Sequence, residues 1–246
     1  MIDDPNRFLR DLFDAALASV TAGHCVPPSL PPPPGGRTVV VGAGKAAAAM
    51  ARAVEDTWPG ALSGIVVVPY GHAVPCTRIE VIEAAHPVPD AAGAKAAQRL
   101  LDAVAGLGPD DLVIALMSGG GSALLASPAR GIALADKQAL TTALLKSGAP
   151  IAEMNAVRKH LSAIKGGRLA TAAWPAPVTT LVVSDVPGDD PATVASGPTL
   201  GDATTLAGAR AILDARAIKA PTAVARHLEQ ARNETPKPDD TRFAAN

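Results

Sequence analysis

A lysine that follows a run of valines has the setting of a phosphate-binding turn. The segment Thr38–Ala47 reads TVVVGAGKAA, and its three consecutive β-branched residues favour a buried strand. Gly42 and Gly44 allow a tight turn, and Lys45 opens an alanine-rich segment that we expect to be helical. A strand that enters a helix through glycines directs backbone N–H groups and the positive end of a helix dipole at one point. The segment therefore predicts a phosphate site in which Lys45 supplies a full positive charge.

Two known nucleotide-binding patterns resemble this turn only in part. Gly42, Gly44 and Ala47 fit the loose dinucleotide pattern G-x-G-x-x-A. That pattern also requires an acidic residue at the end of the second strand to bind a ribose hydroxyl, but here the second strand ends VPY at Tyr70. The P-loop spacing G-x-x-x-x-G-K-[ST] is absent as well. A tight strand–helix turn with a surface lysine is the simpler alternative.

A second glycine loop, SGGGS, follows the apolar segment Leu112–Met117. Three successive glycines lose backbone entropy on folding without any packing in return, so we expect the backbone here to approach another group closely. Successive N–H groups form an anion-binding nest, to which the flanking serines add hydroxyl donors. A flexible loop is the alternative. The predicted nucleotide and phosphate contacts of both loops are Gly42, Gly44, Ser118, Gly119, Gly120, Gly121 and Ser122.

The segment Met154–Leu169, MNAVRKHLSAIKGGRL, has an apolar and a basic side when read as a helix. Asn155, Arg158 and Lys159 lie on the polar side and are candidate contacts for an anionic substrate. A solvated basic face is the competing interpretation. His160 adjoins the apolar side, so we expect a structural role for it.

Three aspartates lie in the turn-rich loop SDVPGDDPATVASGPT, which follows another apolar strand. Carboxylate oxygens on a loop suit Mg²⁺, which uses one or two carboxylates together with substrate phosphate. Asp185, Asp189 and Asp190 are therefore the candidate metal ligands, and Asp185, nearest the strand, is preferred. Aspartate is also common in turns with glycine and proline, which is the alternative reading.

Strand-like and helix-like segments alternate along the chain, and the strand-like segments are uniformly apolar. This pattern predicts an α/β domain in three layers, with a mostly parallel sheet flanked by helices. The carboxyl ends of parallel strands meet at one edge, so the three loops should converge there. The predicted strands are Val39–Val41, Gly64–Pro69, Ile79–Glu83, Leu112–Met117 and Thr179–Val183, and the main predicted helices are Lys45–Thr57, Ala91–Ala105, Leu134–Ser147, Ile151–Arg168, Ala203–Ala215 and Pro221–Arg232.

Composition excludes several classes of protein. Of 246 residues 48% are hydrophobic but only 2% aromatic, and the net charge is −1, which disfavours a nucleic-acid or membrane-surface partner. Two cysteines are too few for a disulfide framework. The sequence contains neither a signal peptide nor an apolar run long enough to span a bilayer, so we expect a cytoplasmic protein.

Taken together, five motifs resemble the glycerate 2-kinase family that carries a C-terminal MOFRL domain, some of whose members are named hydroxypyruvate reductases. Their order is that of the family and they span most of the chain. The motifs are VVGAGKAAAAMA (Val40–Ala51), AAHPVPD (Ala84–Asp90), SGGGSALL (Ser118–Leu125), NAVRKHLSAIKGGRLA (Asn155–Ala170) and SDVPGDDPATVASGPT (Ser184–Thr199).

The resemblance implies transfer of a phosphoryl group from ATP to the 2-hydroxyl of D-glycerate, with Mg²⁺, giving 2-phosphoglycerate and ADP. It implies a Rossmann-like N-terminal domain whose active site lies in a cleft facing a second domain. Lys45 matches an active-site lysine of the family. The glycine loop, including Ser122, and the residues Asp185 and Asp189 match motifs that line the cleft.

Members of the family are longer, and the second domain is expected to supply a catalytic arginine. We therefore expect a truncated member that lacks the MOFRL domain, with little activity by itself. The predicted parts are an N-terminal helix and proline-rich connector (1–36), a Rossmann-like domain (37–232) and an irregular tail (233–246). The expected partner is D-glycerate, with a homodimer left open.

Two other functions stay open at this point. The first is an NAD(P)H-dependent hydroxypyruvate reductase that uses the GAGKAA turn for its cofactor. Two features count against it: the second strand does not end in an acidic residue that could bind a ribose hydroxyl, and the SGGGS loop is suited to a polyphosphate. The second is a non-catalytic domain that binds a nucleotide.

Overall fold

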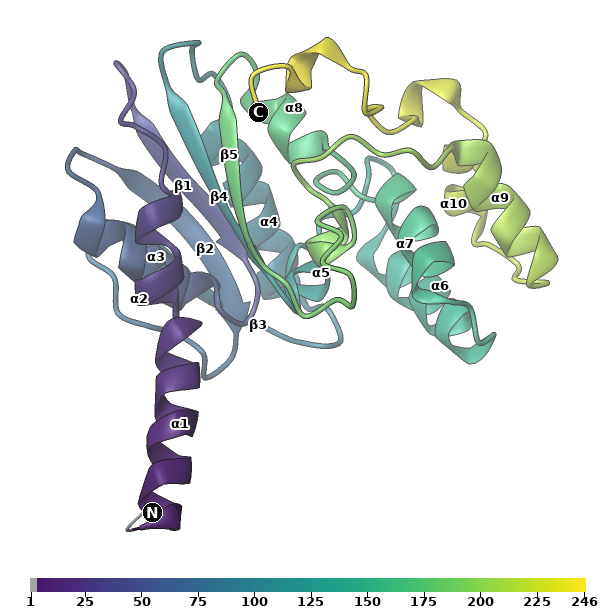
Figure 1. Ribbon diagram of the computed structural model, residues 1–246. Coiled ribbons are helices and arrows are strands. Elements are labelled where there is room, and N and C mark those ends of the chain that lie inside the picture. The colour runs from purple at the N-terminus through teal and green to yellow at the C-terminus, as the bar shows by residue number, and fades with distance from the viewer. Residues whose placement is uncertain (1–3) are drawn as a thin grey trace.

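A parallel sheet forms the centre of the computed structural model, which describes residues 4–246. Its five strands are all parallel and lie in the order β3-β2-β1-β4-β5 (Figure 1). This arrangement, with helices on both faces, confirms the predicted α/β fold. The strands are β1 (Thr38–Ala43), β2 (Ser63–Pro69), β3 (Ile79–Ala84), β4 (Leu112–Ser118) and β5 (Val178–Val183).

Alternate residues of the central strands face two separate apolar cores. Val40 and Ile114 pack with Trp58 on one face, whereas Val41 and Ala115 belong to the core on the other face. Both faces are covered, so β1 and β4 are buried along their whole length, and apart from the terminal Thr38 and Ser118 their sequences are apolar rather than alternating. The covering helices are α2 (Ala22–Cys25) and α3 (Ala47–Thr57) on the first face, and α4 (Ala91–Val104) and α8 (Arg168–Ala173) on the second.

A group of helices beside the sheet forms a third apolar cluster of its own (Figure 1). Four helices each contribute buried side chains to this cluster, among them Leu140, Val157, Ala209 and Val224. These helices are α6 (Leu134–Lys146), α7 (Ile151–His160), α9 (Leu206–Ala215) and α10 (Thr222–Leu228).

The predicted single helix Ile151–Arg168 is wrong, because the chain leaves the helix after His160. The Ser162 hydroxyl accepts hydrogen bonds from two later backbone amides and donates one to the Ser127 carbonyl, which replaces helical bonding. Gly166 and Gly167 then adopt left-handed φ angles of 57° and 81°, and α8 begins only after them. The apolar stripe is accordingly divided between two cores.

Other element boundaries differ by a few residues from the prediction. Lys45 and Ala46 form the turn that precedes α3, so this helix begins at Ala47. The helices α9 and α10 are shorter than expected. Asp90 caps α4 as its side chain suggests, because Oδ1 accepts the Gly93 amide at 2.9 Å. Short 3-10 turns occur at Pro27–Ser29, Val194–Ser196, Ala231–Asn233 and Thr241–Phe243, and α5 is a single turn at Gly121–Leu124.

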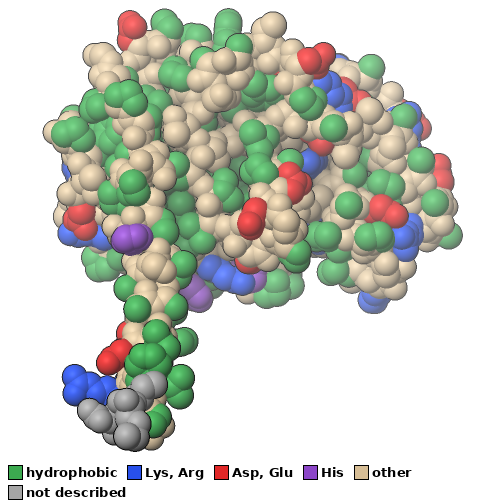
Figure 2. All heavy atoms as spheres, in the orientation of Figure 1, with side chains coloured by type: hydrophobic (Ala, Val, Ile, Leu, Met, Phe, Trp, Pro, Cys, Tyr) green, Lys and Arg blue, Asp and Glu red, His purple; other side chains and the backbone are tan. Residues whose placement is uncertain are grey.

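The first helix, α1 (Pro5–Ser19), projects away from the sheet and buries none of its residues (Figures 1 and 2). Its apolar side, which includes Leu9 and Phe13, faces solvent. Residues 1–3 of the predicted N-terminal part lie outside the described residues. In residues 4–246, no helix is both long and apolar enough to cross a membrane.

The C-terminal residues 233–246 lie on the domain rather than apart from it. Phe243 packs against the core on the α4 face, and a Cβ atom placed on Gly167 would lie 2.7 Å from its ring. The Asn246 side chain accepts the Val178 amide at 2.9 Å, next to the start of β5. The segment without periodic pattern is therefore ordered by contacts to distant parts of the chain.

Candidate functional site

The loops after β1 and β4 are joined at the point where the strand order reverses. The Lys45 amide donates to the Gly119 carbonyl at 2.8 Å, and the Ala46 amide donates to Ser118 Oγ at 3.0 Å. In open α/β sheets, ligands bind outside the carboxyl ends of the strands at such a switch point. The two glycine loops predicted from the sequence therefore meet where a ligand is expected.

Each glycine of the SGGGS loop has a close protein neighbour. A Cβ atom on Gly119 would lie 2.0 Å from Asp185 Oδ2, and one on Gly120 would lie 3.1 Å from the His86 ring. A Cβ atom on Gly121 would lie 2.8 Å from the Ala195 side chain. The expected close approach is thus present, and the approaching groups belong to the protein itself.

The amides of the two loops differ in their availability to a ligand. In the GAGK turn, the Gly44 amide donates to the Val67 carbonyl at 3.0 Å. The amides of Lys45 and Ala46 donate to the Gly119 carbonyl and to Ser118 Oγ. By contrast, the amides of Gly120 and Gly121 have no hydrogen-bond acceptor in residues 4–246. The capacity to bind an anion through the backbone therefore lies on the SGGGS loop.

The two glycines of the GAGK turn have packing roles. Gly42 lies inside β1, where a Cβ atom would come 2.5 Å from the Leu116 carbonyl oxygen. Gly44 has a φ angle of 134°, and a Cβ atom on it would lie 2.1 Å from Ser118 Oγ. Both positions let β1 and its turn fit against β4.

A cation, an imidazole and a carboxylate gather around the SGGGS loop. Lys45 and Asp185 are exposed at its two sides, and His86 lies between β3 and α4. Burial lowers the pKa of His86, and the positive charges of Lys45 and His72 lower it further against the opposing effect of Asp185. The His86 ring is therefore neutral at pH 7. His86 was absent from the predicted site, although its loop directly follows a predicted strand.

The three candidate metal ligands do not converge as one set. Asp190 uses its carboxylate within its own loop, where it accepts the Ala192 amide at 3.1 Å and the Thr193 hydroxyl at 2.7 Å. Asp189 is exposed and has a left-handed φ angle of 52°. In the described part of the chain, no group of three or more His, Cys, Asp and Glu side chains could hold a metal ion. Asp185 is the aspartate that contacts the glycine loop.

A cavity of about 350 Å³ adjoins this edge of the sheet. His86, Gly120 and Ser122 line the side toward the glycine loop, and Arg158 lines another side. Of the predicted substrate contacts Asn155, Arg158 and Lys159, only Arg158 lines the cavity.

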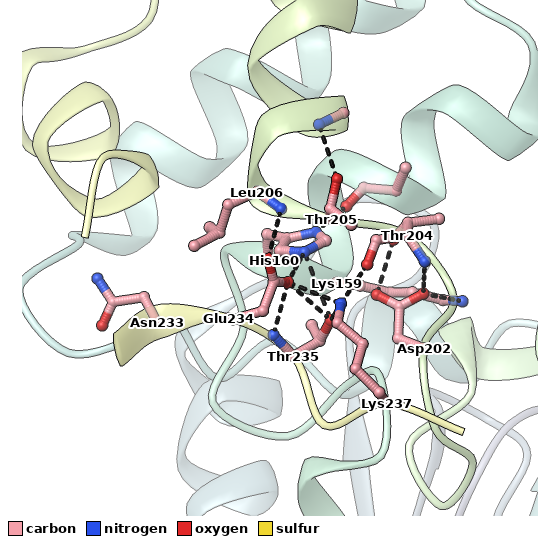
Figure 3. A network of polar contacts seen from close by, with 12 residues as sticks. Lys159, His160, Asp202, Thr204, Thr205, Leu206, Asn233, Glu234, Thr235 and Lys237 are labelled. Atoms are coloured by element: carbon pink, nitrogen blue, oxygen red, sulfur yellow. Dashed lines mark hydrogen bonds and ion pairs between the residues drawn. The ribbon is translucent and has the colours of Figure 1, made fainter. Parts of the chain in front are cut away.

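Lys159 points into a buried polar network instead (Figure 3). Its Nζ lies 3.2 Å from Asp202 Oδ1, and both side chains are largely buried. The adjacent His160 is fully buried, with Nδ1 2.7 Å from the Ala156 carbonyl and Nε2 2.8 Å from Glu234 Oε1. These contacts confirm the structural role expected for His160.

Asn155 contacts the glycine loop indirectly. The Ser196 hydroxyl donates to Asn155 Oδ1 at 3.3 Å and lies 2.9 Å from the Ser122 hydroxyl. Ala195 and Ser196 both have left-handed φ angles, 52° and 64°, which are strained for residues with a Cβ atom. The strained turn holds Ser196 between α7 and the glycine loop.

Comparisons with known proteins agree on one family. The family model described as "Domain of unknown function (DUF4147)" matches residues 8–229. An Agrobacterium vitis protein named "Putative hydroxypyruvate reductase" is 60% identical over 230 residues, which cover 93% of this chain and 52% of that protein. A D-glycerate 2-kinase of Thermotoga maritima is 42% identical over 229 residues, covering 92% of this chain and 54% of that protein.

The crystal structure of a glycerate kinase from Thermotoga maritima has the same fold. Its TM-score is 0.86 at 41% sequence identity, and the match covers 92% of this chain and 55% of that one. The chain thus spans about half the length of the relatives that it matches.

Proposed function

Since this chain belongs to the DUF4147 family, we propose that its glycine-loop edge is one side of a phosphoryl-transfer site that acts on D-glycerate with ATP. The observation that carries this proposal is the gathering of Lys45, His86 and Asp185 around backbone amides without acceptors. Phosphoryl transfer needs alignment of the reactants and neutralisation of charge more than covalent chemistry, and these groups are suited to that task.

The roles follow from the chemistry of each group. The amides of Gly120 and Gly121 bind phosphate oxygens of ATP, and the Lys45 ammonium neutralises negative charge that develops on the transferred group. Asp185 is the carboxylate that would hold Mg²⁺, which supplies further charge neutralisation when bound. Asp189 is exposed in the same loop and would contact such an ion through water.

His86 is suited to receive a proton. The 2-hydroxyl oxygen of the acceptor attacks the terminal phosphorus of ATP, and the bond from that phosphorus to the bridging oxygen breaks and leaves ADP. The hydroxyl proton then passes to the neutral His86 ring, whose lowered pKa keeps it unprotonated at pH 7. The products are 2-phosphoglycerate and ADP.

The names of the relatives also suggest a hydroxypyruvate reductase, and the geometry of the turn counts against it. A dinucleotide pyrophosphate needs free amides after β1, but protein acceptors occupy those of Gly44, Lys45 and Ala46. The Glu83 and Asp90 carboxylates near the end of β2 already accept hydrogen bonds, from the Gly71 amide at 2.6 Å and from the Tyr70 hydroxyl at 2.9 Å. The kinase is therefore the better-supported function.

Parallel assays of the purified chain separate the two activities. ADP formation that requires D-glycerate and Mg²⁺ supports the kinase, and Lys45→Ala should reduce it at least a hundredfold. The Thermotoga maritima enzyme serves as the positive control. Loss of NADH absorbance with hydroxypyruvate would instead establish the reductase. Unchanged turnover in Lys45→Ala would refute the role given to that lysine.

A third outcome identifies a nucleotide-binding domain without catalysis. In that case ATP with Mg²⁺ raises the melting temperature of the chain, but neither reaction proceeds. Asp185→Asn should then remove the Mg²⁺ dependence of the shift, whereas Asp239→Asn, at an exposed position, should leave it unchanged.

A further inference from the structure

The cavity beside the glycine loop is lined by three cationic side chains. It lies between the loop that starts at His86, the short helix α5 and the helix α6, and its volume is about 350 Å³. Lys137 of α6, Arg158 of α7 and Lys165 of the following turn all line it. This volume is at the lower end of the range for small-molecule sites.

Within the described residues 4–246, the three cations have no carboxylate partner. Lys137 is 7% exposed and Lys165 is 1% exposed. The Lys165 ammonium donates to the Ser122 carbonyl at 2.7 Å, and the Lys137 ammonium has only a long contact of 3.4 Å to the Ser127 carbonyl. Among the ion pairs of residues 4–246, none involves Lys137, Arg158 or Lys165.

Burial of cations without counter-charges is unfavourable, and it lowers the pKa values of the two lysines. Burial lowers the pKa of Lys137 to about 7, and the charge of Arg158 acts in the same direction. Burial and the charges of its two neighbours also lower the pKa of Lys165 well below its usual range. An anion in the cavity would relieve this cost, because it would restore the charged form of each lysine.

The walls of the cavity favour a small organic anion over a polyphosphate. Pro87, Val88 and Leu134 provide apolar surface, and Gln138 and Thr141 provide groups that can hydrogen bond to hydroxyls. A polyphosphate carries several charges and keeps a hydrated metal ion, which this partly apolar enclosure does not suit. A carboxylate with a short hydroxylated carbon chain suits both kinds of wall.

The cavity is continuous with the proposed phosphoryl-transfer edge. His86 and Gly120 belong to both, and a Cβ atom on Gly120 would lie 3.1 Å from the His86 ring and 3.5 Å from Lys45 Cγ. A molecule in the cavity would therefore adjoin His86 and Gly120 of that edge.

We propose that this cavity binds the carboxylate of a small hydroxy acid, with Lys137 and Arg158 as its direct contacts and Lys165 behind them. The identification of that acid as the phosphoryl acceptor rests on the proposed function. The assignment includes Lys137, which no sequence motif indicated, and leaves out Lys159, which pairs with Asp202.

Calorimetry on the purified chain tests the site directly. The probes are D-glycerate, glycerol as its uncharged counterpart and inorganic phosphate. We expect D-glycerate to bind and glycerol to fail, and Lys137→Met and Arg158→Gln each to weaken D-glycerate binding at least tenfold. Lys146→Met is the matched control, because Lys146 lies on the same helix but is exposed, and it should bind as the unmodified chain does.

Three results would overturn the proposal. These are no binding of D-glycerate to the chain, unchanged affinity in both cavity variants, and tighter binding of phosphate than of D-glycerate with the same dependence on Lys137. Circular dichroism of each variant must match the unmodified chain. Lys137→Met removes a buried amine that makes a single long contact, so we expect it to fold.

The proposal and the kinase function can fail separately. Lys45→Ala should keep the affinity for D-glycerate even where phosphoryl transfer is lost. Binding that depends on Lys137 without any ADP formation would retain the carboxylate site and refute kinase activity of this chain by itself. ADP formation with an unchanged KM for D-glycerate in Lys137→Met would retain the kinase and refute the carboxylate site.

Discussion

At the level of single residues, the candidate site depends on the absence of side chains as much as on charged groups. Gly119 has no unusual φ angle, yet the Asp185 carboxylate occupies the space that a Cβ atom would need. The carboxylate reaches the glycine loop only because that space is empty. This explains why glycine stands at a position where backbone freedom is not required.

Gly119→Ala should therefore displace Asp185 without unfolding the chain. We expect the Mg²⁺-dependent increase in melting temperature with ATP to fall by at least half, because the metal-binding carboxylate moves away. Gly35→Ala is the control, since a Cβ atom there would meet nothing within 4 Å. An undiminished Mg²⁺ effect in Gly119→Ala would show that Asp185 does not hold the ion.

Lys137 should make the stability of the ligand-free chain depend on pH. Its pKa is lowered to about 7 in the folded chain, against 10.5 for an ordinary lysine, so the unfolded chain holds more protons between these values. The unmodified chain should gain stability relative to Lys137→Met as pH rises from 7, by up to about 1.4 kcal/mol per pH unit. Urea unfolding at pH 7 and pH 9 measures this difference. An identical pH response of the two proteins would contradict it.

At the level of elements, the turn between α7 and α8 determines which cations reach the cavity. A continuous helix would have kept Arg158 and Lys165 on the rigid spacing of one helix. Ser162 and the two glycines end α7 instead, and Lys165 turns back toward the Ser122 carbonyl. Arg158 and Lys165 thereby line the same cavity from different elements.

The first helix should contribute little to the stability of the domain. None of its residues is buried, so removal of residues 1–20 should shift the melting temperature by no more than about 2 °C. By comparison, Leu100→Ala in α4 removes a fully buried side chain and should cost about 2–5 kcal/mol. Thermal and urea unfolding of both proteins test this. A large loss of stability on removing α1 would show that the helix packs against another surface in solution.

At the level of the whole molecule, the C-terminal segment ties the helical cluster to the sheet. Glu234 accepts hydrogen bonds from the Leu206 amide and the Lys237 ammonium and also contacts His160 (Figure 3). Burial raises the pKa of Glu234, but Lys237, the Leu206 amide and His160 lower it more, to about 2. The ionised carboxylate is thus the form that the fold stabilises.

Glu234→Gln should destabilise the chain by about 1–3 kcal/mol at pH 7. The pKa of this carboxyl is 4.5 in the unfolded chain and about 2 in the folded chain. The difference in free energy of unfolding between the two proteins should therefore have its full size above pH 4.5 and disappear as pH falls toward 2. Glu229→Gln, at an exposed position, is the control. A difference between Glu234→Gln and the unmodified chain that stays constant from pH 7 to pH 3 would argue against this role.

The sequence alone was sufficient for the sheet and for the two loops at its edge. Runs such as LVIALM are apolar on both faces of a strand, and only a strand covered on both sides can use them, so the parallel α/β fold follows from local pattern. Likewise, Lys45 and the SGGGS loop both follow strands directly, and parallel strands end at one edge.

Only the tertiary structure decided which charged groups are free to meet a ligand. Lys159 and Arg158 are neighbours in sequence, yet Asp202, 43 residues away, pairs with one and leaves the other in the cavity. His160 meets Glu234 across 74 residues. His86 lies in a motif to which the sequence assigned no site residue, and Lys137 reaches the cavity from a helix outside all of the motifs. Whether a charge is paired depends on contacts between distant segments, and these exist only once the helices have packed against the sheet.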